Sequence, residues 1–268
     1  MQIGVGYRRE LASWLASRPR GITAVELTAE HFYGAPKQLA ALIRSCTLLG
    51  NPMSRFVHGL GLSLGTPGPL DRQRVKQFCE VAEACQAQWI SEHVAFTRSA
   101  ETDLGHLNPV PPTRDSLKIM AEHALELASC CGRPLLLENI TSHVRLRGEM
   151  SETDYLNELC CRAGCGLLLD VTNLFVNSRN HGFDPVQWLY ELEPEFIVQL
   201  HIVGYSRRGK RYIDDHAKAV PPELLELAQA VIQYAPVKAI ILERDADFPE
   251  TSAMEEEIAK LESLCAGN

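Results

Sequence analysis

The sequence lacks the features of membrane-spanning, secreted and nucleic-acid-binding proteins. No stretch approaches the ~18 uncharged apolar residues that a transmembrane helix requires, and the chain opens directly on a strand-like pattern, so no signal peptide is expected. Basic runs are scarce: the single one is at residues 207–211, in a chain of formal net charge -8. Because phosphate backbones are bound by clustered Lys and Arg, we expect no nucleic-acid partner and no membrane.

The chain also has no CxxC pair, although it contains nine cysteines. Those that fall in predicted helices are Cys79, Cys85, Cys130, Cys131, Cys160 and Cys161. An odd number without metal-site spacing is typical of thiols that are buried as small hydrophobic side chains in a reducing compartment. We therefore predict that the cysteines are buried free thiols and that the protein is located in the cytoplasm.

No repeat, low-complexity tract or linker divides the chain, so we expect a single domain over residues 1–268. Eight short apolar runs are predicted strands, at residues 2–7, 24–27, 56–60, 89–93, 135–139, 166–170, 196–201 and 239–243. They alternate with eight predicted helices, at 10–17 and 36–49, after Asp71, Thr113 and Ser151, from Pro185, at 221–234 and after Ser252. This alternation predicts an α/β fold, a single (β/α)8 TIM barrel. A doubly wound open sheet is the alternative, and it fits less well because its functional residues would gather at one switch point.

Two connections are predicted to be irregular. Residues 95–112 form the longest of them, and long loops in compact domains are usually lids or partner-binding arms. Residues 207–220 form a polar loop that includes the basic run. The loop at 95–112 and the basic run at 207–211 are candidates for contact with a peptide or a partner protein.

Side chains of the metal-ligand type stand at nearly every predicted strand end. In a barrel these ends open on one face, so distant residues converge. The convergent set is His58, His93, Glu138, Asp170, Asn173, His201, Asp214, His216 and Glu243. Carboxylates crowded together repel one another unless divalent cations neutralise them. Imidazole mixed with carboxylate suits Fe, Mn or Zn better than Mg or Ca. We expect Glu26, Glu92 and Ser91 to orient the histidines.

Each of these residues alone has an ordinary structural explanation. His58 can be a core histidine, Glu138 can pair with Arg244, and Asp170 can cap a helix. Their joint occurrence at successive strand ends predicts a metal centre.

In these motifs the chain resembles the multinuclear non-heme iron-dependent oxidative enzymes, long catalogued as a domain of unknown function with a xylose-isomerase-like barrel. The matching motifs span nearly the whole chain: Gly4-Val-Gly6-Tyr7-Arg8, His58-Gly59, Ser91-Glu92-His93, Glu138-Asn139, Leu169-Asp170-x-x-Asn173-x-x-x-Asn177, His201-x-x-Gly204, Asp214-x-His216 and Glu243-Arg244.

The resemblance implies oxidative modification of cysteine in a ribosomally made precursor peptide, using two or three irons and O2. It also implies a small partner subunit that captures the peptide leader. His58, His93 and Glu138 would hold one iron, with Glu138 able to bridge to a second. Asp170, His201 and Glu243 would serve the second iron, and Asn173, Asp214 and His216 a third. Glu138, Asp170, His201 and Asp214 would be the catalytic residues.

One position departs from the pattern of many members, which carry a second histidine four residues after the one at 201. Here that position is Tyr205. With the opening Met-Gln-Ile-Gly-Val-Gly-Tyr-Arg, Tyr205 resembles the methanobactin-biosynthesis branch. That branch converts cysteine into an oxazolone ring with a neighbouring thioamide, as a heterodimer with its companion subunit.

Two other functions fit the same residues. The first is a divalent-metal hydrolase or isomerase on the same barrel, similar to endonucleases or xylose isomerase, and metal identity separates it from an oxidase. The second is a non-catalytic scaffold subunit, which the full set of ligands disfavours.

Overall fold

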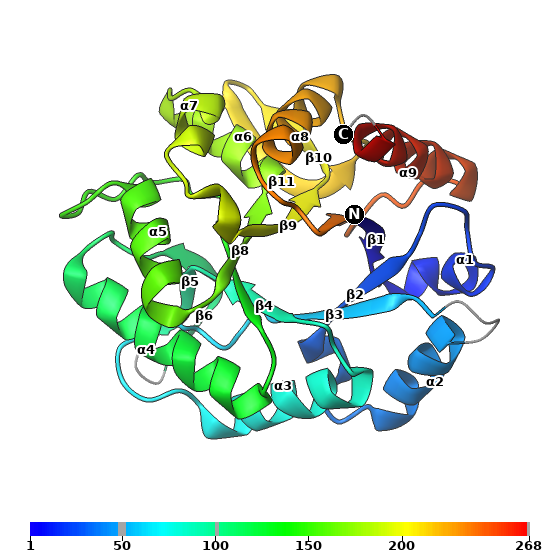
Figure 1. Cartoon of the computed structure of the whole chain (residues 1–268), viewed down its shortest axis with the longest axis horizontal. Helices are drawn as coiled ribbons and strands as arrows, with labels where there is room; N and C mark the ends of the chain where they lie inside the picture. Colours follow the sequence, from blue (N-terminus) through cyan, green and yellow to red (C-terminus); the bar gives the residue numbers. More distant parts are fainter. Residues whose placement is uncertain (48–51, 100–101, 267–268) are drawn as a thin grey trace.

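The chain folds into a closed barrel of eight parallel strands surrounded by helices (Figure 1), as the sequence predicts. The computed structural model describes residues 1–47, 52–99 and 102–266. The barrel strands, in chain order, are β1 (Gln2–Gly6), β2 (Ala24–Thr28), β3 (Ser54–His58), β4 (Ile90–His93), β7 (Leu135–Glu138), β8 (Gly166–Asp170), β9 (Ile197–Ile202) and β12 (Ala239–Leu242). Each pairs in parallel with its neighbours, and β1 closes the ring on β12, with Gln2 opposite Ala239.

The interior of the barrel below the strand ends is filled by apolar side chains. Its members are Ala24, Phe56, Trp89, Leu136, Leu168, Ala239 and Ile241. Phe56 and Trp89 stack with ring centroids 4.1 Å apart. The Trp89 indole N–H donates to Gln199 Oε1 at 2.6 Å, and Gln199 Nε2 in turn donates to Glu26. This layer is therefore a buried apolar floor, and the polar side chains of the site lie above it.

The helices pack around the outside of the barrel (Figure 1). They are α1 (Ala12–Ala16), α2 (Pro36–Thr47), α3 (Arg72–Cys85), α4 (Arg114–Cys131), α5 (Glu152–Ala163), α6 (Val171–His181), α7 (Pro185–Tyr190), α8 (Pro222–Tyr234) and α9 (Thr251–Ala266), with the short 3-10 helices η1 (Arg9–Leu11), η2 (Ala29–Phe32) and η3 (Pro194–Phe196). The predicted caps Asp71, Thr113 and Ser151 accept backbone N–H groups at their helix starts, which confirms them. The predicted helix end at Leu49 lies outside the described residues. Among the described helices, none combines the length and apolar character that crossing a bilayer demands.

Helix α6 is absent from the sequence prediction, which places the next helix after β8 at Pro185. It begins at Val171, directly after the last residue of β8. Asp170 is both the strand end and the N-cap, since its side chain accepts from Asn173 N. No turn residues separate the two elements, so the helix cap at Asp170, which the sequence analysis gave only as an alternative explanation of that residue, is the one boundary signal.

Two predicted loops are antiparallel hairpins, so the prediction of irregular structure was wrong in both. Residues 95–112 contain β5 (Ala95–Ser99) paired with β6 (Thr102–Pro109), and residues 207–220 belong to the pair β10 (Gly204–Arg208) and β11 (Arg211–Lys218). Their residues are polar and largely exposed, so the alternation of buried and exposed side chains that marks a strand is weak.

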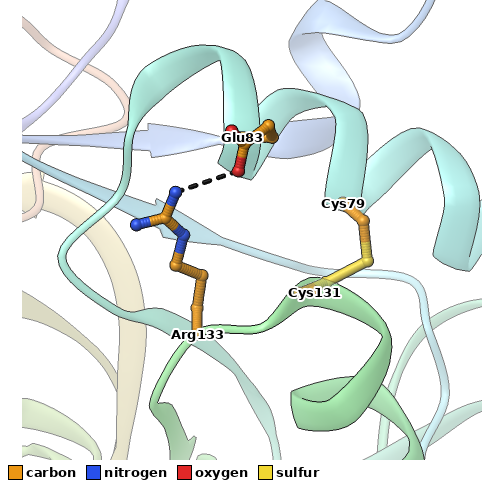
Figure 2. The surroundings of a disulfide bond; sticks show 4 residues. All are labelled: Cys79, Glu83, Cys131 and Arg133. Carbon is orange, nitrogen blue, oxygen red and sulfur yellow. Dashed lines mark hydrogen bonds and ion pairs between the residues drawn. A yellow bond between two sulfur atoms is a disulfide. The ribbon is translucent and has the colours of Figure 1, made fainter.

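The prediction that the cysteines are thiols was wrong for one pair. Cys79 of α3 and Cys131 at the end of α4 form a disulfide with a Cα–Cα distance of 4.8 Å (Figure 2). Beside it, Arg133 pairs with Glu83 at 2.9 Å. The partners are 52 residues apart, and the packing of the two helices that brings them together cannot be derived from cysteine spacing. Cys130 and Cys161 are exposed, also against the prediction.

Reduction of this disulfide is expected to lower the free energy of unfolding by about 2–4 kcal/mol, because the bond closes a long loop in the unfolded chain. Urea unfolding with and without dithiothreitol measures the effect. The matched control is the Cys79→Ser/Cys131→Ser variant, which should unfold at the same urea concentration under both conditions. A wild-type protein that is insensitive to reductant would contradict the prediction.

Candidate metal centre

The first group of ligand-type side chains comes from the ends of β3, β4 and β7. His58, His93 and Glu138 are all buried, and their nearest ligand atoms lie within 4.8 Å of one another. Both imidazoles turn Nε2 toward the same carboxylate oxygen, Glu138 Oε2, at 3.4 Å each. That buried oxygen has no hydrogen-bond partner. An unpartnered buried carboxylate oxygen is costly unless a cation meets it, so this arrangement fits a metal ion.

The far sides of the two imidazoles are held by neighbouring polar groups. His58 Nδ1 lies 2.8 Å from Ser91 Oγ. His93 Nδ1 lies 3.1 Å from Gly59 O, and Glu92 contacts both the backbone N–H and the ring of His93. The predicted orienting contacts of Ser91 and Glu92 are thus confirmed. Such contacts fix the ring so that Nε2 remains directed into the site.

The second group contains Glu138, Asp170, His201 and Glu243, all buried. His201 Nδ1 lies 3.3 Å from Glu138 Oε1 and 3.0 Å from Glu243 Oε2. Its Nε2 contacts Glu26 Oε1 at 2.5 Å, which is the contact with a histidine that we expected of Glu26. Glu138 therefore belongs to both groups, with one oxygen directed to each. This is the geometry of a bridging carboxylate.

The two carboxylate oxygens of Asp170 have different tasks: one caps a helix and the other faces the site. Its Oδ1 accepts from Asn173 N at 2.7 Å, which caps α6. Its Oδ2 is buried and has no hydrogen-bond partner. Asn139 holds the Asp170 backbone from both sides, accepting from its N–H at 2.8 Å and donating to its C=O at 3.0 Å. The carboxylate thus has a fixed position and one free oxygen, which again fits a cation.

A third group lies at the rim and contains His216, Glu243 and Asp245. His216 Nδ1 is 3.1 Å from Asp245 Oδ2 and 3.7 Å from Glu243 Oε2, while its Nε2 is 2.9 Å from Asp214 Oδ1. Asp245 was not among the predicted residues. It stands two positions after Glu243, and this i, i+2 spacing was the available signal. Arg8 pairs with both Glu243 and Asp245.

Asn173 is buried beside the centre, but its amide contacts neighbouring chain groups. Its Oδ1 accepts from the Thr141 hydroxyl, and its Nδ2 donates to Asn139 O at 3.1 Å. The structure therefore brings together seven of the nine predicted ligands in these three groups. The other two contact members of the groups: Asp214 contacts His216, and Asn173 donates its backbone N–H to Asp170. The alternative ion pair between Glu138 and Arg244 is absent, because Arg244 pairs with Glu257 at 2.8 Å.

The family described as RiPP precursor modification enzyme MbnB/TglH/ChrH matches residues 2–266. The chain belongs to this family. A UPF0276 protein from Chromobacterium violaceum is 35% identical over 267 residues, covering 98% of this chain and 95% of the relative. A UPF0276 protein from Acinetobacter baylyi is 30% identical, covering 98% and 90%.

Solved structures share the fold of this RiPP-modifying enzyme. A D-psicose 3-epimerase in the presence of D-fructose superimposes with a TM-score of 0.66 at 12% identity, over 98% of both chains. Endonuclease IV from Thermus thermophilus gives 0.63 at 16% identity, over 98% of this chain and 100% of its own. At these identities the likeness shows the fold alone.

The electrostatics of the enzyme's centre are those of crowded charges removed from water. Burial, then the neighbouring His93 and His201, lower the pKa of His58 well below its usual value. Burial also acts to lower the pKa of His93, but Glu138 and Glu92 outweigh it and raise that pKa to about 9. Burial, with Asp214 and Glu138 nearby, raises the pKa of Asp170 well above its ordinary value. The centre therefore retains protons at neutral pH that a metal ion would displace.

The affinity of the metal-free enzyme for Zn2+ is expected to rise with pH between about pH 7 and pH 9, by up to about tenfold per pH unit for each proton displaced. The sign follows from the raised pKa of His93: below about 9 its ring is protonated, and a ligand must be neutral. Above that pKa the dependence should flatten. Competition with a chelator of known pH dependence measures it. An affinity that is constant over this range would contradict the assignment of His93 as a ligand.

Proposed function

We propose that this enzyme is a multinuclear iron- and O2-dependent oxidase that modifies cysteine in a ribosomally made precursor peptide, in the cytoplasm and together with a small leader-binding subunit. The proposed product is the oxazolone and thioamide pair of methanobactin-type copper chelators. Membership of the precursor-modification family supports the peptide substrate. The observation that carries the proposal is Glu138, whose two oxygens face two separate ligand groups.

The proposed ligand sets follow the observed groups. His58, His93 and Glu138 would hold one iron, and Glu138, Asp170, His201 and Glu243 a second. For a third iron, the resemblance implies Asn173, Asp214 and His216, whereas the structure groups His216 with Glu243 and Asp245. His216 is common to both sets.

The chemistry that bound irons supply here is coordination of a cysteine thiolate and activation of O2. Formation of an oxazolone and thioamide is a four-electron oxidation, so four hydrogens leave the peptide while O2 is reduced to two waters. The protein's own part is to keep the ligands fixed. Glu26 and Glu92 orient His201 and His93, and Asn139 fixes the backbone of Asp170. The buried apolar floor would exclude water from below.

The test is coexpression with candidate precursor peptides and a candidate partner protein chosen from the reading frames that flank the gene, followed by purification under low oxygen. Metal analysis should give two to three irons per chain, and mass spectrometry should show loss of four hydrogens per modified cysteine after O2 is admitted. Oxygen consumption without a change in peptide mass would refute peptide oxidation. Three zincs per chain would indicate a hydrolase, and manganese or magnesium an isomerase.

A further inference from the structure

A cavity of about 630 Å3 opens beside the metal centre and is not used by any ligand described above. It lies between the end of β6, the connection from β7 to α5 (residues 139–151), the first turns of α5 and the end of α6. Asn139 lines it and also bonds the backbone of Asp170. The cavity therefore reaches the residue next to Glu138. Its volume is within the range of ligand sites.

The connection from β7 to α5 is fixed at both ends. At its start, Asn177 accepts from Ser142 N at 2.9 Å and donates to Ile140 O at 2.8 Å, while His181 Nε2 lies 2.8 Å from Ser142 O. At its end, the N–H groups of Glu149 and Met150 donate to Pro112 O. Gly148 is required there, because a Cβ would lie 2.2 Å from the same carbonyl.

Between these anchors the backbone is unpaired. In residues 145–148, all of which the structure describes, no N–H or C=O takes part in a hydrogen bond with another part of the chain. Val144 is 60% exposed and Leu146 37% exposed, although both line the cavity. Unpaired backbone beside exposed apolar side chains is a template for pairing with an extended peptide.

The charged side chains that line the cavity indicate which kind of ligand it favours. Arg145 and Arg147 line it, and neither has a carboxylate within ion-pair distance among the residues described. The Arg145 guanidinium lies over the Phe183 ring at 5.6 Å. Glu152 also lines the cavity and interacts electrostatically with Arg145, so the wall carries two guanidinium groups against one carboxyl group. In a chain of net charge -8, this excess of positive charge favours an anionic ligand.

We infer that this groove docks an extended, acidic segment of the precursor peptide, with residues 145–148 pairing along its backbone and Arg145 and Arg147 contacting its carboxylates. This inference rests on the proposed function. It explains how a peptide cysteine would reach the centre: a segment held in the groove continues past Asn139 to Glu138.

The first test is binding by fluorescence anisotropy, without O2, to the iron-loaded enzyme with its partner subunit. The probes are fluorescein-labelled synthetic copies of the cysteine-containing candidate precursors chosen from the reading frames that flank the gene, each also made with Asp and Glu replaced by Asn and Gln. Arg145→Glu/Arg147→Glu should weaken binding about tenfold or more, and the neutralised copy should lose no further affinity on this variant. The matched control is Arg20→Glu/Arg44→Glu, at two exposed positions that do not line the cavity, which should bind as wild type.

Three outcomes would overturn this docking proposal. They are unchanged peptide binding by Arg145→Glu/Arg147→Glu, equal weakening of peptide binding by Arg20→Glu/Arg44→Glu, and an Arg145→Glu/Arg147→Glu variant that loses the partner subunit but not the peptide. A wild-type enzyme that binds none of the copies would do the same. The proposed function fails separately, if the peptide binds through the groove but its mass is unchanged after O2.

The second test locates the peptide without changing charge. A photo-crosslinking p-benzoylphenylalanine placed at Val144 should capture the labelled precursor. The control is the same residue placed at Leu125, which is 49% exposed on α4 and does not line the cavity. Capture of the precursor at both positions, or only at Leu125, would overturn the proposal that the peptide docks in this groove.

Discussion

Glu138→Gln is expected to leave a folded enzyme that has lost metal from two sites and whose peptide-modifying activity has fallen by at least about 100-fold. The expected loss of activity is this large because Glu138 faces the metal sites directly, and mutation even of the groups that only contact metal ligands lowers metal affinity or activity by about 10–100-fold. Glu138 Oε2 faces His58 and His93, and Oε1 faces His201. Glutamine keeps the shape and removes the charge. Iron per chain and peptide mass, measured on the same preparation, check the prediction.

The matched control is Glu30→Gln. Glu30 is also a partly buried carboxylate near the barrel mouth, and burial, together with Glu92, raises its pKa. It accepts from the backbone N–H groups of Leu60 and Gly61 at 2.9 Å each and belongs to none of the three ligand groups. Glu30→Gln should therefore retain wild-type iron content. If Glu138→Gln loses metal from only one site, the carboxylate does not bridge.

The sequence predicts the parts of this molecule that depend on strongly periodic patterns. Buried runs such as 166–170 can only be interior strands, and closing eight of them into a barrel brings their last side chains to one face. Hence His58, His93, Glu138 and His201 could be placed together without coordinates. The contacts of Ser91, Glu92 and Glu26 follow from the same rule, because they stand at or next to the ends of their strands.

The features that the sequence does not predict depend on relations between elements. Asp170 ends β8 and caps α6 at once, which removes the boundary that a turn would mark. Asp245 joins His216 only because β11 lies beside the segment after β12, where Asp245 N donates to His216 O at 2.9 Å. The Cys79–Cys131 bond likewise needs the packing of α3 against α4. No local pattern contains these distances.

Asp170→Asn and Asp170→Ala should separate the two tasks of this residue. Both variants remove the free Oδ2 and are expected to lose metal from the second group. Asparagine can still accept from Asn173 N, so α6 keeps its cap, whereas alanine should lower the free energy of unfolding of the metal-free protein by a further ~1 kcal/mol. Iron analysis and urea unfolding measure the two effects independently. Equal stability of the two variants would show that the cap contributes nothing.

The pH dependence of the metal-free protein tests the same carboxyl group. Because burial raises its pKa in the folded state, Asp170 binds a proton more tightly when folded than when unfolded, where its pKa is about 4. Stability from this group is therefore lost as pH rises above about 4 toward the folded pKa. Asparagine does not titrate, so the stability of Asp170→Asn relative to wild type should increase with pH. Urea unfolding of both metal-free proteins at acidic and neutral pH measures this difference. A difference that stays constant would mean that folding does not shift the pKa of Asp170, and one that shrinks as pH rises would mean that the folded site stabilises the ionised carboxylate even without metal.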